Sequence, residues 1–502
     1  MTIMGVTGSA SVVVQSLADL RAKLDDLQRQ LGTGQTSDNY AGLGSQRSLV
    51  VGLQSQLDAA QGFDDTITMV GTRLSIAQTA LTQISQSAQN VQSILVQQDF
   101  TLGQNGQTVN QQSAQGELDS ILAALDSQDA TGYIFSGLAT NQAAVDSLDH
   151  IMNGNGAQAG FKQVLSERQQ ADGANGLGRL LIPPPAGTVV TVSEDAAGSP
   201  FGLKLAGVNS TLTGTIVAGP AGVPPAISVN VQTNPNAGEM LNLSFTLPDG
   251  SSENLTLTAT TSNPPGANQF TIGATAAATA ANLQAALTTA VSKLADTSLV
   301  AASAVAAAKD FFDTDAANPP QRVNGPPFNT ATSLIAGTPS NTVTWYTGEA
   351  GASPARSTAI ARVDPAVTIS FGMRANEQGL RNVVKNVAVF AAMSFSANDP
   401  NAADQYSALT ARLAANFAPS QGTQTVADIQ TELVNAQTMA NTAKDRHTQS
   451  TATLTDFLQK IENVSPDQVG TELLSVQTAL QASLQTTAML SKLSLINYLP
   501  IS

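Results

Sequence analysis

The chain has 502 residues, a length that suits about three domains, and a formal net charge of −15 although only 12% of its residues are charged. The acidic balance argues against a nucleic-acid-binding face, because phosphate recognition needs clustered Lys and Arg. The absence of cysteine excludes disulfides, thiolate nucleophiles and Cys-ligated metals.

The first expected elements are two long amphipathic helices. Residues 1–31 form the first, and glycines with a Ser-Asp-Asn cluster predict a loop at residues 32–44. The second helix runs from about Ser45 to about Gln98. Both carry apolar residues at alternating spacings of three and four, which is typical of a coiled-coil seam. The longer seam consists of Ile67, Val70, Leu74, Ala77, Leu81, Ile84, Ala88, Val91 and Leu95.

The middle of the chain changes character. A third helix is expected at residues 111–126 and a short strand or strand-like turn at residues 132–137. From about Asn153 to Pro365 the chain is rich in Gly, Pro, Thr, Val and Ala. Alternating apolar residues around a Pro-Asp-Gly turn predict a β-hairpin at residues 241–258. A helix is expected at residues 281–312, and strands at 343–346 and 367–371. The middle is therefore a mixed, β-containing insert.

Helical patterning returns near Arg374 and continues to the C-terminus, with breaks at residues 398–400 and at Pro419. The last helix begins at about Pro466. Neither helical end completes a core alone, so we expect the two ends to pair. The predicted fold class is α+β: a long antiparallel coiled-coil or helical-bundle rod formed by both termini, with a β-rich mixed domain inserted in the middle and projecting from the far tip of the rod.

This pairing predicts five segments. They are an N-terminal assembly helix (1–45) pairing with a C-terminal one (466–502), two halves of the helical rod (46–152 and 373–465), and the inserted variable domain (153–372). The seams predict an assembly interface made of Val13, Leu17, Leu20, Leu24, Leu27, Leu31, Val469, Leu473, Val476, Leu480 and Leu484.

No catalytic, cofactor or metal site is expected. The two histidines, His150 and His447, lie far apart in the sequence and outside any metal-ligand spacing. Glycine pairs such as Gly42 and Gly44 lack the residues that complete a phosphate loop and are interpreted as turns. No apolar run reaches the roughly 18 residues that span a bilayer, and residues 1–17 lack the features of a cleaved signal peptide. We therefore expect no enzyme activity, no cofactor, no nucleic-acid partner and no membrane insertion.

Several segments resemble the bacterial flagellin family. They are LQRQLGTG at residues 27–34, SDNYAGL at residues 37–43, where Asn39 replaces a second Asp, and SIAQTAL at residues 75–81. The resemblance covers the helical ends and not the middle. It implies a secreted structural subunit of the extracellular flagellum, exported by the flagellar type III route with a chaperone on the C-terminal helix. The chaperone-binding residues would be Leu480, Leu484, Leu490 and Leu493. The other partners would be the chain itself, flagellin and axial proteins of the hook-associated protein 1 type.

Within the family, two segments resemble the hook-filament junction type (hook-associated protein 3). They are GYIFSG at residues 132–137 and the tail from QTALQASL at residues 477–484 to LSL at residues 493–495. A filament flagellin remains the alternative, because the insert is long for a junction protein. A secreted surface adhesin or enzyme with flagellin-like ends is a third hypothesis, in which the insert would carry the active or ligand site.

Overall fold

The computed structural model describes residues 5–97, 99–315, 318–419 and 421–496. It confirms the predicted fold class, with long N- and C-terminal helices and a central β-rich region. The chain divides into two compact units. The terminal unit comprises Met1–Met69, Arg362–Thr368 and Met439–Ser502, and the central unit comprises Val70–Ala361 and Ile369–Thr438.

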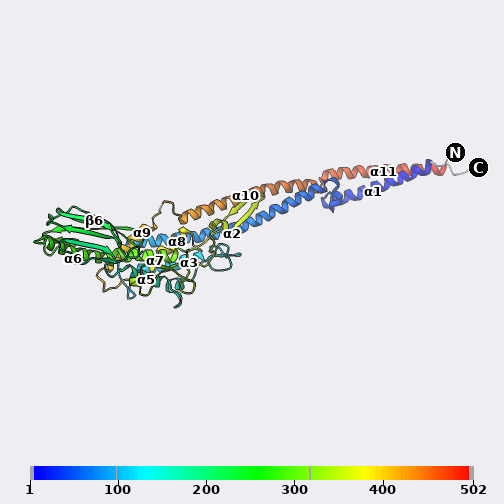
Figure 1. Cartoon of the computed structure of the whole chain (residues 1–502). Coiled ribbons are helices and arrows are strands. Elements are labelled where there is room, and N and C mark those ends of the chain that lie inside the picture. Colours follow the sequence, from blue (N-terminus) through cyan, green and yellow to red (C-terminus); the bar gives the residue numbers. More distant parts are fainter. Residues whose placement is uncertain (1–4, 98, 316–317, 420, 497–502) are drawn as a thin grey trace, which may run out of the picture. The chain divides into compact units, whose positions relative to one another are not determined.

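Long helices make up most of the terminal unit. Helix α1 (Gly5–Thr33) packs against α11 (Pro466–Ile496), and Figure 1 shows the two running side by side. The 3-10 helix η1 (Tyr40–Gln46) leads into α2 (Arg47–Gln97), whose first half belongs to this unit. The second half of α10 (Val426–Glu462) also belongs to it. The helices predicted from about residues 1, 45 and 466 are therefore present.

The terminal unit also contains the tip of a hairpin formed by β13 (Ile360–Asp364) and β14 (Val367–Ser370). His447 of α10 is buried beneath this tip, with its Nε2 atom 2.8 Å from the carbonyl oxygen of Val363 and its ring stacked on Phe63 at a centroid distance of 5.5 Å. Arg446 forms an ion pair with Asp364. His447 is therefore a packed helix residue.

The helices of the central unit surround a mixed core. Helix α3 (Val109–Leu125) buries Leu118, Ile121, Leu122 and Leu125, the face predicted from the sequence. It packs against α8 (Gln378–Ala392), which also contacts α7 (Val300–Phe312) and α9 (Ala402–Phe417). Helices α4 (Leu148–Asn153) and α5 (Phe161–Asp172) also belong to this unit and were not predicted from the sequence.

Two four-stranded sheets form the β-rich part of the central unit. One has the order β3-β4-β7-β6: β3 (Leu180–Leu181), β4 (Val189–Glu194), β7 (Ala226–Val231) and β6 (Thr215–Ala221). The other has the order β10-β9-β8-β5: β10 (Gln269–Thr271), β9 (Ser252–Thr260), β8 (Met240–Thr246) and β5 (Lys204–Ser210). All pairings are antiparallel except that of β10 with β9.

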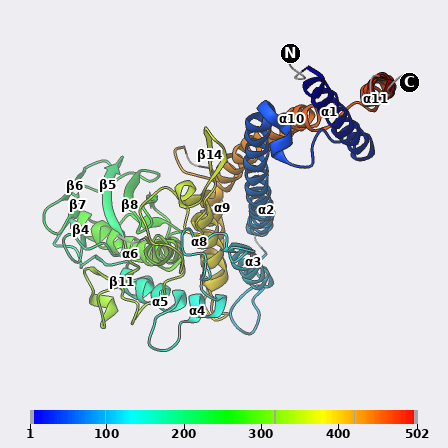
Figure 2. The ribbon, with the colours of Figure 1, turned by 90° about the vertical axis from the view of Figure 1, so that its right-hand side faces the viewer.

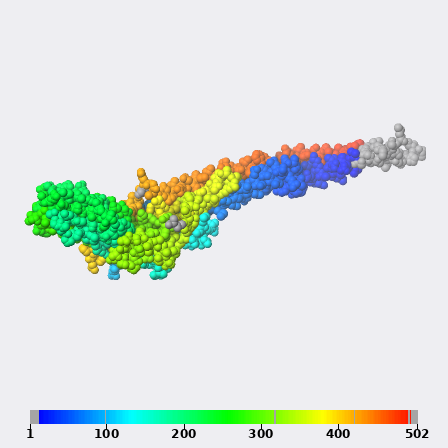
Figure 3. Space-filling view, viewed as in Figure 1, coloured from blue at the N-terminus to red at the C-terminus, as the bar shows by residue number. Residues whose placement is uncertain are grey.

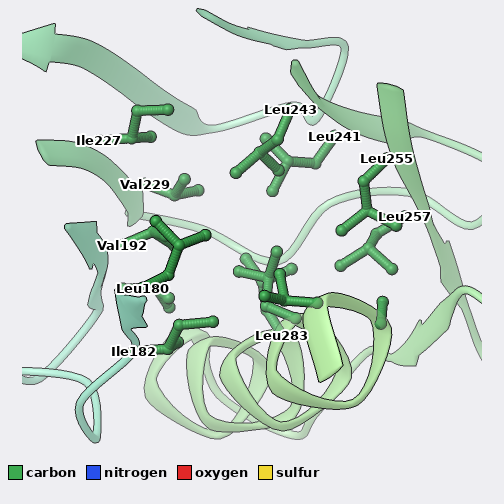
Figure 4. Close-up of a cluster of buried hydrophobic side chains, with 14 of the residues drawn as sticks. Leu180, Ile182, Val192, Ile227, Val229, Leu241, Leu243, Leu255, Leu257 and Leu283 are labelled. Carbon is green, nitrogen blue, oxygen red and sulfur yellow. The ribbon is translucent and has the colours of Figure 1, made fainter. Parts of the chain in front are cut away.

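Helix α6 (Ala276–Leu294) packs against strands of both sheets, and Figure 2 shows the strands arching over it. Alternate residues of the strands point inward because side chains of a strand alternate between its two faces. Leu243, Leu257 and Val229 meet Leu283 of α6 in the buried cluster drawn in Figure 4. The predicted hairpin at residues 241–258 is confirmed as β8 and β9, with Leu243, Phe245, Leu247, Leu255 and Leu257 all buried.

One strand prediction in this region is wrong. Residues 343–346 do not form a strand: Thr342 and Tyr346 make only isolated bridges, to Ala159 and Val145. The helical stretch Ala276–Phe312, which includes a π-helical segment (Ala295–Leu299), is long and apolar enough to cross a membrane by length and composition. In this structure 67% of its most apolar window is buried, and the core helix of a soluble protein passes the same test.

The other short strands form three two-stranded sheets with their neighbours. They pair β1 (Gln128–Asp129) with β2 (Gly132–Tyr133), β11 (Gln321–Val323) with β12 (Leu334–Ala336), and β13 with β14. The strand or strand-like turn expected at residues 132–137 begins as β2 and continues as a turn, and the expected strand at 367–371 corresponds to β14.

Candidate assembly interface

The pairing of α1 with α11 rests on a narrow apolar seam. Leu27, Val469 and Val476 are buried in it, and Leu20, Leu24, Val464 and Leu473 are packed around them. Figure 3 shows the blue atoms of α1 lying against the red atoms of α11 along the part of both helices that it colours. Burial of each large aliphatic side chain contributes about 1.5–3 kcal/mol, so this short seam stabilises the pair only modestly.

Polar contacts fix the pair in antiparallel register. Lys23 and Glu472 form an ion pair of 2.8 Å. The segment after α1 then crosses the segment before α11. Thr36 N donates to Glu462 O at 2.7 Å, and Val464 N donates to Gly34 O at 3.0 Å. Because these bonds join backbone groups, they set the register whatever side chains the seam carries.

The flagellin-like motif at residues 27–43 builds the turn that makes this crossing possible. Gly34 ends α1 with a φ of 72°, a left-handed conformation that glycine adopts without steric cost. Arg29 contacts Asp26 at 2.6 Å and Asp38 at 2.8 Å. Asn39, the residue that departs from the family pattern, caps η1 by accepting a hydrogen bond from Gly42 N. An Asn side chain can cap as Asp does.

Two predicted interface residues lie off the buried seam. Leu484 is 43% exposed. It follows Val476 and Leu480 at two consecutive spacings of four, which turn its side chain away from α1. The neighbouring Ser483 is half-buried instead. Leu31 is 47% exposed and is not part of the apolar cluster between α1 and α11. Val13, Leu17 and Leu480 are half-buried. The side chains of Leu490 and Leu493 lie outside the described residues.

The sequence analysis missed a second set of apolar residues on these two helices, which point away from the seam. Val12, Val14, Leu474 and Met489 are each more than 60% exposed. The sequence could have shown this second surface, because apolar residues recur outside the seam and a two-helix pair in water needs only one apolar stripe per helix. The outer surface of the pair can therefore bind further helices.

The segment GYIFSG is held in the central unit by Arg73 of α2. The buried guanidinium contacts Asp129 at 2.9 Å and Thr131 Oγ1 at 2.8 Å, and it donates to the carbonyl oxygen of Tyr133 at 3.2 Å. Ile134 and Phe135 are fully buried beyond this contact. The segment is therefore a buried structural turn.

Another buried polar cluster in the central unit joins Arg168 to two carboxylates. Its Nε atom lies 2.9 Å from Asp172, and its Nη1 atom lies 2.7 Å from Asp310. Burial raises the pKa of Asp172 and raises that of Asp310 to about 6, although Arg168 opposes both shifts. Among the described residues, no group of three or more His, Cys, Asp or Glu side chains is placed to hold a metal.

Comparison with known protein families supports this description. Residues 7–140 match the family model of the bacterial flagellin N-terminal helical region. The match supports the bacterial flagellin family. The matched range contains α2, α3, the motif turn after α1 and the GYIFSG segment. A flagellin N-terminal region supports a structural flagellar subunit, and the flagellin family is a structural, non-enzymatic family whose members self-assemble into the extracellular flagellar filament. No curated protein matched the chain.

Proposed function

We propose that this chain is a structural subunit of the bacterial flagellum and that it is the hook-filament junction protein. The observation that carries the proposal is the flagellin match over residues 7–140 together with the antiparallel α1–α11 pair. In this proposal the paired terminal helices stack with those of neighbouring subunits, and the residues Val13 to Leu31 and Val469 to Leu484 form the assembly interface.

The exposed apolar residues supply the driving force for stacking. Val12, Val14, Leu474 and Met489 lie in water in the single chain. Transfer of such side chains into a helix-helix contact is favourable by about 25 cal/mol per Å² of apolar area. A thin α1–α11 seam gains further stability when neighbours cover its open sides. Assembly and ordering of the pair are thus coupled.

The junction subtype rests on two segments. GYIFSG is a buried turn fixed by Arg73, and the tail from residue 477 belongs to α11. Both resemble the junction type. One observation favours the alternative, a filament flagellin: the central unit carries two complete four-stranded sheets around a shared core, a large insert for a junction protein.

Labelling of the assembled appendage separates these functions. An antibody against the β6–β7 hairpin, which carries the exposed Val223, would be detected with gold by electron microscopy on purified flagella. Label confined to the boundary between hook and filament supports the junction protein. Label along the filament supports a flagellin, and label elsewhere on the cell overturns both.

The proposed partners are copies of the chain, flagellin, an axial protein of the hook-associated protein 1 type, and an export chaperone. The chaperone would bind the apolar side of α11 through Leu480, Leu484, Leu490 and Leu493, because an amphipathic helix binds a groove through such anchors. Calorimetry with the cognate chaperone tests this. Leu480→Asp with Leu484→Asp should abolish binding, whereas Gln481→Asp should not; equal affinity of all variants would refute the assignment.

A further inference from the structure

A groove in the central unit has no part in the proposed assembly. It has a volume of about 820 Å³ and is lined by the end of α5, residues 173–180, the segment after α8 and the start of α9. This volume lies within the range of about 300–1,000 Å³ that is typical of small-molecule sites.

One wall of the groove is a glycine-rich loop held rigidly. Leu203 N donates to Gly178 O at 2.9 Å, and Asp195 N donates to Arg179 O at 3.1 Å. Behind the loop, a Cβ atom on Gly202 would lie 2.5 Å from Gly178 O, so the backbones touch. Arg179 has a φ of 69°, a left-handed conformation that a non-glycine residue keeps only where the surrounding structure holds it. Such a preorganised wall loses little entropy when a ligand binds.

The charged groups of the groove are already satisfied by the protein. The Nε atom of Arg179 lies 2.6 Å from Asp195, and its Nη1 atom donates to Asn329 O at 2.7 Å. Asp399 accepts hydrogen bonds from Gln405 Nε2 and Asn401 N, each at 2.8 Å. Among the described residues that line it, the groove therefore offers neither a free cation nor a free anion to a charged ligand.

Amide and hydroxyl groups remain available. The side chains of Asn175, Asn329 and Ser394 make no hydrogen bond to any part of the chain that the structure describes, and all three are exposed in the groove. Leu177, which is half-buried, adds apolar surface to the same groove. Donors and acceptors without net charge, beside apolar patches, match the hydroxyls and C–H faces of a sugar.

We propose that this groove binds a short neutral oligosaccharide. The ligand's hydroxyls bond to Asn175, Asn329 and Ser394, and its apolar face rests on Leu177. This site is independent of the helical ends and so holds for a junction protein and for a filament flagellin alike.

Calorimetric titration of the full chain with maltotriose, xylotriose and chitotriose tests the proposal, with trigalacturonate as the charged probe. At least one neutral probe should bind with a Kd below about 1 mM. Asn175→Ala combined with Ser394→Ala should weaken it about tenfold or more, whereas Gln115→Ala, an exposed amide of α3 outside the groove, should leave it unchanged. The bound probe should also slow amide exchange in residues 173–180 of the unmodified chain.

Three results would overturn the proposal. They are no binding of any neutral probe, tighter binding of trigalacturonate, and equal affinity of the double variant. The exchange measurement needs no substitution, so a double variant that fails to fold still leaves a decisive readout: a bound probe that slows exchange elsewhere and not in residues 173–180 rejects the groove.

Discussion

The backbone N–H of Thr36 donates a 2.7 Å hydrogen bond to the carbonyl oxygen of Glu462, joining the first turn after α1 to the last residue of α10. Val464 N returns a bond to Gly34 O. This reciprocal crossing holds the N-terminal and C-terminal helices side by side although nearly the whole sequence separates them. The pairing of α1 with α11 therefore depends on the backbone conformation of Gly34.

Gly34→Ala should therefore weaken the α1–α11 pair. No atom lies within 4 Å of the position its Cβ would take, so the cost is that of the left-handed φ alone, about 1 kcal/mol. Gly32→Ala is the matched control, since Gly32 lies inside α1 with equal space around it, and alanine favours a helix by about 0.5–1 kcal/mol. Amide exchange in α1 should quicken in the first variant and slow in the second. The same sign for both would contradict this account.

Leu27 and Leu31 provide a second matched pair on one helix. Leu27 is 4% exposed in the seam, and Leu31 is 47% exposed. Leu27→Ala should cost about 2–3 kcal/mol, at the low end of the range for buried Leu→Ala, and Leu31→Ala less than about 1 kcal/mol. Exchange protection in α1 and α11 measures both. Equal losses would mean that the seam does not hold the pair together.

Much of this architecture could be predicted because it depends on local periodicity. The alternation through Leu243, Phe245, Leu255 and Leu257 defines a hairpin with one buried face, and the tertiary structure buries that face. The strand predicted at residues 343–346 is absent. Trp345 is instead buried against Phe312 at a ring distance of 5.8 Å and donates its Nε1 hydrogen to Phe312 O. Burial there comes from an aromatic cluster, which follows no sequence period.

The interface was predicted less well than the fold. A seam read from one helix cannot show how far the partner helix covers it, and so Leu31 was included although its side chain is 47% exposed. The groove beside Arg179 could not be found at all, because its walls come from segments far apart in the sequence. Only the glycines of residues 173–178 gave a local signal, and alone they indicate a turn.

The Arg168 cluster should make the central unit less stable as pH rises from about 4 to about 6. Burial raises the pKa of Asp310 from 3.8 to about 6, so the folded state binds its proton more tightly than the unfolded state does. The contribution of Asp310 to the free energy of unfolding is fully present below about pH 4 and is lost as the pH rises through about 6, a change of about 3 kcal/mol. Asp310→Asn should remove this fall.

Fluorescence of Trp345, the single tryptophan, reports unfolding of this unit because its ring packs against Phe312. The midpoint of Asp310→Asn relative to the unmodified chain should therefore rise between pH 4 and pH 7. Asp58→Asn, an exposed position of α2, is the control and should show no such trend. A constant difference between Asp310→Asn and the unmodified chain across that range would contradict the shifted pKa.

Substitution of Leu474 should impair polymerisation more than it impairs folding of the single chain. Its side chain is 64% exposed on α11, so Leu474→Glu removes little packing from the single chain. In an assembly it would place a charge in an apolar helix-helix contact, where an unpaired charge costs several kcal/mol. Ser475→Glu adds the same charge at the adjacent exposed position. We expect both variants to match the unmodified chain in circular dichroism and melting, and Leu474→Glu alone to fail to form filaments by light scattering and electron microscopy. Normal filaments from Leu474→Glu would show that this face of α11 is not buried between subunits.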